Sequence, residues 1–147
     1  MVMLAGFLSE REQELMSATY PIHHITLTVT DIQSHVEWFQ SVFGPADIVE
    51  REFDDFFRTR LTWPDLDDLR IALIQHKAGD PAARFNHLQP GLDHLGFECK
   101  TPEEVHAWAE KLDGLGVVHG PIEDVQYGVV LTARTPDNIP IEFFFAK

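Results

Sequence analysis

The segment IHHITLTVT, residues 22–30, decides the fold because its side chains alternate between apolar and polar from His24 onward. A period of two residues is typical of a strand that packs one face against a core and leaves its other face open. The apolar set should face a helix, and it consists of Ile25, Leu27 and Val29. His24 therefore belongs to the open face of this strand.

A helix and three further strands are expected directly after this strand. Asp31 or Ser34 can cap a helix with an apolar stripe, and Gly44-Pro45 ends that helix. The stripe is formed by Val36, Trp38, Phe39, Val42 and Phe43. Strand-like stretches follow at about residues 47–53, 56–63 and 69–76. The first half of the chain therefore predicts the order βαβββ.

The same order returns 70 residues later. GLDHLGFEC at residues 91–99 is a second alternating strand, and Thr101-Pro102 opens a second helix that Gly114 and Gly116 end. Strands are expected near residues 117–119, 128–134 and 140–145. A shift of 70 without a gap matches His24 with His94, Trp38 with Trp108 and Gly44 with Gly114.

This repeat predicts an α+β fold built from a duplicated βαβββ unit. Half a chain of this length has too small a core to be stable alone, so the two halves should join. We expect two modules paired into a cup-shaped mixed sheet, with helices outside. Residues 21–147 form one domain, in which module one spans 21–76, a linker spans 77–90 and module two spans 91–147. Residues 1–20 are an extension, where Ser9 and Glu12 fit a capping box; it is either a helix that contacts a second copy or, as we favour, a frayed tail.

Charge and composition narrow the function classes. The 147 residues include 11 basic and 24 acidic side chains, which gives a formal net charge of −13. Such an acidic chain argues against binding to nucleic acid phosphates. No apolar run reaches the roughly 20 residues of a membrane span, and no signal-peptide pattern is present. The single cysteine, Cys99, excludes an intrachain disulfide, fits an inert buried thiol and suggests a cytoplasmic protein.

Three side chains on the predicted open faces form a candidate metal site. His24 and His94 occupy equivalent strand positions, and Glu142 interrupts the apolar strand IPIEFFF on the same face. Two neutral imidazoles and one carboxylate suit a divalent metal such as Fe(II), and Mn, Ni or Zn would also fit. Three protein ligands leave coordination positions open for a substrate. The simpler alternative is that Glu142 pairs with an arginine and the histidines are ordinary polar residues.

These motifs resemble the vicinal-oxygen-chelate superfamily. HHITLTVTDIQSHVEWFQSVFG at residues 23–44 and GLDHLGFECKTPEEVHAWAEKLDGLG at residues 91–116 are similar to the openings of its two modules, and RTPDNIPIEFFF at residues 134–145 is similar to its closing motif. The superfamily includes glyoxalase I, extradiol dioxygenases, epimerases, fosfomycin-modifying enzymes and metal-free bleomycin-binding proteins. The resemblance implies paired βαβββ modules, a homodimer, a small-molecule substrate and metal-ligand roles for His24, His94 and Glu142.

One departure from the pattern bears on the reaction. Glyoxalase I-like members have a fourth ligand on the last strand of module one, where this chain has Ala72. The remaining three-ligand set is more similar to that of the extradiol dioxygenases, so we favour Fe(II)-dependent dioxygenation of a catechol. Tyr127 would then donate a hydrogen bond to the bound substrate.

Two other functions remain open. The first is a metal-dependent lyase or isomerase, for which Glu98 is the available base on the open face. The second is a metal-free protein that sequesters a small molecule in the cup. Weaker candidate residues are His119, expected to be exposed, and Arg58, Arg60 and Arg134, which could hold a carboxylate substrate but are expected to form surface ion pairs.

Overall fold

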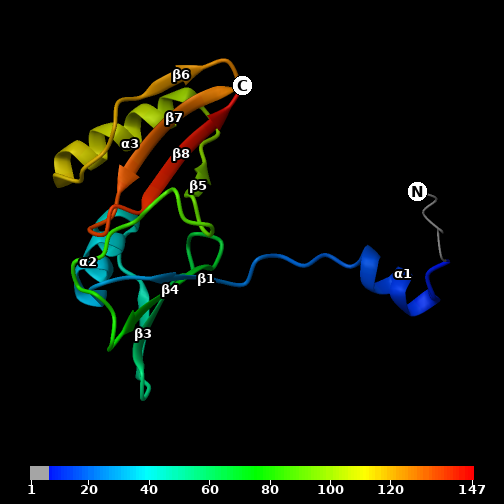
Figure 1. Cartoon of the computed structure of the whole chain (residues 1–147). Coiled ribbons are helices and arrows are strands. Elements are labelled where there is room, and N and C mark those ends of the chain that lie inside the picture. Colours follow the sequence, from blue (N-terminus) through cyan, green and yellow to red (C-terminus); the bar gives the residue numbers. More distant parts are fainter. Residues whose placement is uncertain (1–6) are drawn as a thin grey trace.

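The computed structural model describes residues 7–147, so the first six residues of the predicted extension lie outside the described part. Helix α1 (Glu10–Ser17) begins at Ser9, whose hydroxyl accepts from the Glu12 amide at 3.2 Å while the Ser9 amide donates to the Glu12 carboxylate at 2.7 Å. The predicted capping box is therefore confirmed. An extended segment joins α1 to the body, and Figure 1 shows the helix standing away from the rest of the chain. All side chains from residue 7 to residue 24 are exposed.

Module one has the predicted βαβββ order. It consists of β1 (Ile25–Thr28), α2 (Ile32–Phe43), β2 (Asp47–Glu52), β3 (Phe56–Trp63) and β4 (Leu69–His76). The strands form one sheet in the order β1-β4-β3-β2, in which β1 runs parallel to β4 and the other neighbours are antiparallel. Asp31 caps α2 by accepting from the Ser34 amide at 2.8 Å, and Gly44 with φ 91° ends it, as expected.

Module two repeats this topology. Its elements are β5 (Leu95–Glu98), α3 (Pro102–Leu115), β6 (Glu123–Val125), β7 (Gly128–Arg134) and β8 (Pro140–Ala146), with the sheet order β5-β8-β7-β6. The turns before the last strands also match, because Asp68 and Asn138, 70 residues apart, both have positive φ, at 54° and 66°. The α+β class and the duplicated βαβββ unit are confirmed.

Two details of module two differ from the prediction. The expected strand at 117–119 is wrong: His119 makes a single bridge to Ala133, and the strand that pairs with β7 is β6, at 123–125. In addition, Gly114 lies inside α3, and only Gly116, with φ 67°, ends the helix.

The two modules share one hydrophobic core, although their sheets are not hydrogen-bonded to each other within residues 7–147. Phe43, at the end of α2, lies 4.9 Å from the ring of Phe97 and 5.8 Å from that of Trp108, measured between centroids. Helices α2 and α3 also touch, and Lys111 donates to the Val42 carbonyl at 2.7 Å. The helices therefore meet at the junction between the modules, and each sheet keeps a second face that none of the helices within residues 7–147 covers.

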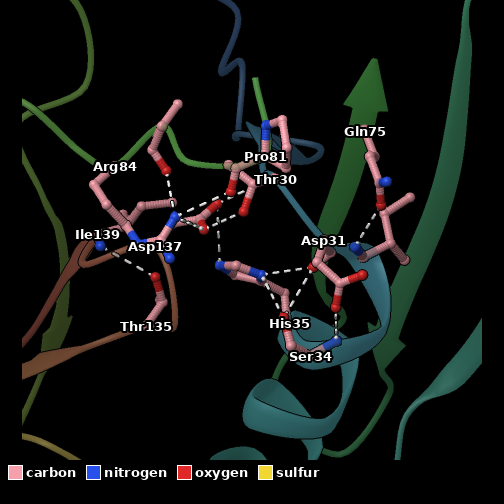
Figure 2. Close-up of polar contacts among 12 residues, drawn as sticks. Thr30, Asp31, Ser34, His35, Gln75, Pro81, Arg84, Thr135, Asp137 and Ile139 are labelled. Carbon is pink, nitrogen blue, oxygen red and sulfur yellow. Dashed lines mark hydrogen bonds and ion pairs between the residues drawn. The ribbon is translucent and has the colours of Figure 1, made fainter. Parts of the chain in front are cut away.

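A polar clasp reinforces this junction (Figure 2). Asp137, in the turn before β8, is 5% exposed and accepts from the Thr30 amide at 2.7 Å and the Thr30 hydroxyl at 2.5 Å. His35, fully buried in α2, binds the Asp31 carbonyl through Nδ1 at 2.8 Å, and its Nε2 lies 3.7 Å from Asp137. One carboxylate of module two thus holds the end of the first strand of module one.

Candidate metal centre

His94 and Glu142 meet on the open face of module two. His94 precedes β5, and Glu142 lies in β8 in register with Gly96 of β5. Their side chains approach to 3.7 Å between His94 Nε2 and Glu142 Oε2. They border a cavity of about 380 Å³ that Thr132, Arg134 and His87 also line. The strand alternation in the sequence predicted this shared face.

The geometry of this pair fits two ligands of one metal ion. Metal bonds to imidazole nitrogen and to carboxylate oxygen are about 2.1 Å long, so two ligands of one ion lie no more than about 4.2 Å apart. The distance of 3.7 Å satisfies that limit. Asp93 Oδ1 lies 2.7 Å from His94 Nδ1, which directs a proton to Nδ1 and leaves Nε2 free to ligate. Asp93 was not among the residues predicted from the sequence, although a carboxylate directly before the candidate ligand His94 was a visible signal.

His24 lies on the other module. It immediately precedes β1, it is exposed, and its Nδ1 lies 2.9 Å from that of His23. Among residues 7–147, no group of three or more His, Cys, Asp or Glu side chains is close enough to hold a metal. One chain therefore brings together two of the three predicted ligands and leaves the third on the open face of module one.

The two further candidate residues do not line this cavity. Tyr127 is in the turn before β7, is 70% exposed, and has its ring 6.3 Å from that of Phe144. Glu98 is exposed in β5, in register with Phe144 and therefore on the same face as Glu142. Ala72 in β4 is buried, so the position equivalent to Glu142 offers no ligand.

Two other titratable groups take structural roles. The ring nitrogens of His119 lie 2.7 Å from Asp113 Oδ1 and 2.7 Å from the Gly120 carbonyl oxygen. The hydrogen bond to Asp113, followed by that to Gly120, raises the pKa of His119 above its usual value. Cys99 is 3% exposed, and burial raises the pKa of its thiol, as expected for an inert cysteine.

The sequence and fold comparisons agree with this architecture. The family model described as Glyoxalase/Bleomycin resistance protein/Dioxygenase superfamily matches residues 21–143. A manganese-dependent 2,3-dihydroxybiphenyl 1,2-dioxygenase from Geobacillus genomosp. 3 is 26% identical over 125 residues, which cover 83% of this chain and 35% of the relative. The chain thus spans about a third of that curated relative.

Solved structures show the same fold. A glyoxylase/bleomycin resistance protein/dioxygenase domain from Frankia sp. EAN1pec has a TM-score of 0.77 and 25% identity, over 88% of this chain and 94% of that one. The fosfomycin resistance protein FosX from Listeria monocytogenes, as an E126Q mutant complexed with Mn(II) and 1S,2S-dihydroxypropylphosphonic acid, has a TM-score of 0.65 and 22% identity, over 88% and 95% of the two chains.

The fold is a duplicated βαβββ unit, and it carries a histidine–carboxylate pair on the open face of its second sheet. This chain belongs to the Glyoxalase/Bleomycin resistance protein/Dioxygenase superfamily, the vicinal-oxygen-chelate superfamily of the sequence motifs. None of the described helices is long and apolar enough to cross a membrane.

Proposed function

We propose that this protein is a divalent-metal-dependent enzyme that chelates two vicinal oxygens of a small substrate, and that it oxygenates a catechol-type diol. The observation that carries the proposal is the Asp93–His94–Glu142 arrangement, in which an oriented imidazole and a carboxylate lie 3.7 Å apart. The manganese-dependent dioxygenase named above supports both the metal and the reaction. Mn(II) and Fe(II) are the metals to test first.

The third ligand comes from a second copy of the chain. His24 is exposed on the uncovered face of module one, while His94 and Glu142 lie on the uncovered face of module two. A two-fold dimer that places these faces together forms two equivalent sites, each with His24 from one copy and His94 and Glu142 from the other. The protein is thus a homodimer in this proposal, and neither site is complete in one chain.

In this proposal, each residue around the metal has a separate role. The metal, when bound, acts as a Lewis acid that holds and polarises the two substrate oxygens. Asp93 keeps the His94 proton on Nδ1, so that Nε2 remains a donor to the ion. Ala72, at the position equivalent to Glu142, keeps a fourth protein ligand away and leaves room for the substrate. Tyr127 is exposed with its ring beside Phe144, and in this proposal its hydroxyl donates a hydrogen bond to the bound substrate.

A lyase or isomerase of the same family is the second candidate. Glu98 favours it, because this exposed carboxylate shares the open face with Glu142 and can accept a proton from a bound substrate. Oxygen consumption separates the two reactions. Metal-loaded protein is supplied with a panel of catechols in an oxygen electrode, and uptake supports dioxygenation. No uptake, combined with turnover of a diol or carbonyl substrate under anaerobic Ni or Zn loading, would support the second candidate instead.

Metal binding and the shared site can be tested together by complementation. The variants His24→Ala and Glu142→Ala each lack a ligand in every site, so each alone should bind Mn(II) weakly. After the two are mixed and allowed to exchange subunits, one site of each mixed dimer regains all three ligands, and about a quarter of the wild-type sites should return. His106→Ala, an exposed histidine of α3, is the matched control. If mixing restores no sites, the site is not shared between copies.

A further inference from the structure

Four of the seven arginines of this acidic chain lie on one sheet face. The core side of β3 and β4 carries buried residues such as Leu61 and Leu73, which pack with α2. Alternation places the neighbouring residues on the opposite, uncovered face. That face carries the arginine cluster, which consists of Arg51 of β2, Arg58 and Arg60 of β3, and Arg70 of β4.

These arginines have no anionic partner among residues 7–147. In the part of the protein that the structure describes, none of the four forms a side-chain hydrogen bond or has a carboxylate oxygen within 4.0 Å. The surface ion pairs expected for Arg58 and Arg60 from the sequence are therefore wrong. Alternation also places Asp47 on this face, in register with Thr62, without contact to a guanidinium. Arg58 instead lies over the ring of Phe53, at 5.2 Å.

The arginine cluster lowers the stability of the sheet when no anion is bound to it. Arg51 and Arg58 lie directly opposite each other on neighbouring strands, where like charges destabilise a sheet. The Nε atom of Arg60 is buried and has no hydrogen-bond partner, although a buried donor normally has one. The chain has 24 acidic residues, yet none of those within residues 7–147 neutralises this face. An external oxyanion would offset the repulsion and would pair with the Arg60 guanidinium once that side chain turns outward, since guanidinium groups bind such anions in a bidentate manner.

The arginine cluster lies beside the third metal ligand. Arg60 is in register with Ala72, and Ala72 with Thr26 of β1, so these residues form one row across the face. His24 precedes Thr26 by two residues and lies on the same face, next to the row of Arg70. Neighbouring rows on one face are about 7 Å apart along a strand, and β3 lies two strand spacings, about 10 Å, from β1. Arg60 is therefore roughly 12 Å from His24 across the face, a span that an extended small substrate can bridge.

We propose that the arginine cluster binds an anionic oxygen group, a carboxylate or a phosphonate, carried by the substrate whose vicinal oxygens the metal takes. This inference rests on the proposed function and narrows its substrate class from neutral diols to anionic ones. Arg60 and Arg58 hold the anion, and Arg51 and Arg70 add positive potential at the two sides of them. The arginine cluster thereby fixes the anionic end of the substrate, while the vicinal oxygens at the other end of the substrate reach the metal.

The test uses the full-length protein after a chelator has removed metal, so that it does not depend on the metal centre. Arginine Nε–H signals are followed by NMR while methylphosphonate, acetate or neutral acetamide is added at constant ionic strength. We expect saturable shifts for Arg58 and Arg60 with the anions and none with acetamide, and Arg11 of α1 is the control in the same spectrum. Tighter binding of methylphosphonate assigns a phosphonate-type group, and tighter binding of acetate assigns a carboxylate. Absence of a saturable shift with both anions, or equal shifts with acetamide, would overturn the proposal.

Variants localise the effect. Arg60→Gln should weaken binding of the better anion at least tenfold, whereas Arg11→Gln should leave it unchanged. Arg60→Lys keeps the charge but loses the planar fork, so an intermediate loss is expected; this variant also serves if Arg60→Gln does not fold. Unchanged affinity in a folded Arg60 variant contradicts the inference. Mn(II) titration of the wild-type protein separates the two proposals, because absent anion binding with intact metal binding refutes only the arginine cluster, and anion binding without metal binding refutes only the metal site.

Discussion

The contact between Asp93 and His94 controls how well a single side chain of the proposed site can bind metal. A carboxylate that holds one imidazole nitrogen raises the basicity of the other and fixes its orientation, and the loss of such a partner costs about 10- to 100-fold in metal affinity. We therefore expect Asp93→Asn to weaken Mn(II) binding by about that factor in a calorimetric titration. Asp65→Asn, in an exposed turn, is the matched control. Equal affinities of the two variants would show that Asp93 does not support the metal ligand.

His119 provides a prediction on pH at the same scale. Its protonated ring can donate to Asp113 and to the Gly120 carbonyl at once, whereas the neutral ring can donate only one proton. The raised pKa of His119 therefore predicts an NMR titration midpoint above the usual 6.5, and Asp113→Asn should move it back toward that value. The stabilisation from this contact is fully present below pH 6.5 and is lost as the pH rises through the raised pKa. An unchanged midpoint in the Asp113 variant would contradict this assignment.

The site could be predicted from the sequence only where a local pattern carried the information. Alternating polarity along the two segments that carry His94 and Glu142 predicted that these side chains share one face. The roles of His35 and Asp137 had no such signal, because the contact of Asp137 with Thr30 joins positions 107 residues apart. The separation of His24 from His94 had none either, since it depends on how two similar modules pack rather than on either module alone.

At the scale of elements, two glycines of module two make opposite predictions. Gly114 lies within α3, and a Cβ there would meet nothing within 4 Å, so Gly114→Ala should stabilise the protein by about 0.5–1 kcal/mol through helix propensity. Gly128 begins β7, where a Cβ would lie 2.4 Å from the Phe144 ring and 2.5 Å from the Phe145 carbonyl. Gly128→Ala should cost about 1–3 kcal/mol by overpacking. Thermal unfolding of the two variants measures both effects. Shifts of the unfolding temperature in the same direction would contradict one of the two predictions.

The elements themselves were largely predictable. Caps at Ser9, Asp31 and Thr101 marked three helix starts. Strand-like patterns marked seven of the eight strands, six of them to within a residue or two, whereas β5 begins four residues after the start of the predicted stretch at 91–99. The exception, β6, has only three residues and no alternation, and its position depends on hydrogen bonds to β7 that no local pattern encodes.

The whole molecule depends on the junction between its modules, and the clasp at Asp137 can be tested there. Asp137→Asn keeps the shape of the side chain but removes the charge that accepts two hydrogen bonds from Thr30. Hydrogen bonds to a charged group contribute about 1.5–3 kcal/mol, so a loss of about 2 kcal/mol in unfolding free energy is expected from denaturant titration. Asp67→Asn, at the equivalent and exposed turn of module one, is the control and should change little. Equal effects would show that the clasp does not hold the modules.

The proposed shared metal site couples metal binding to the association of two copies of the chain. If each metal takes His24 from one copy and His94 and Glu142 from the other, the metal binds the dimer in preference to the monomer, and it must tighten the dimer by linkage. At a metal concentration of 100 times the dissociation constant, each site contributes up to about 2.7 kcal/mol, and two sites up to about 5.4 kcal/mol. Sedimentation of dilute protein should therefore show a dimer dissociation constant that falls on adding Mn(II). His24→Ala should abolish this metal dependence, while His106→Ala should retain it. A dissociation constant that does not respond to metal in the wild-type protein would place the complete site within one chain, or show that His24 is not a ligand.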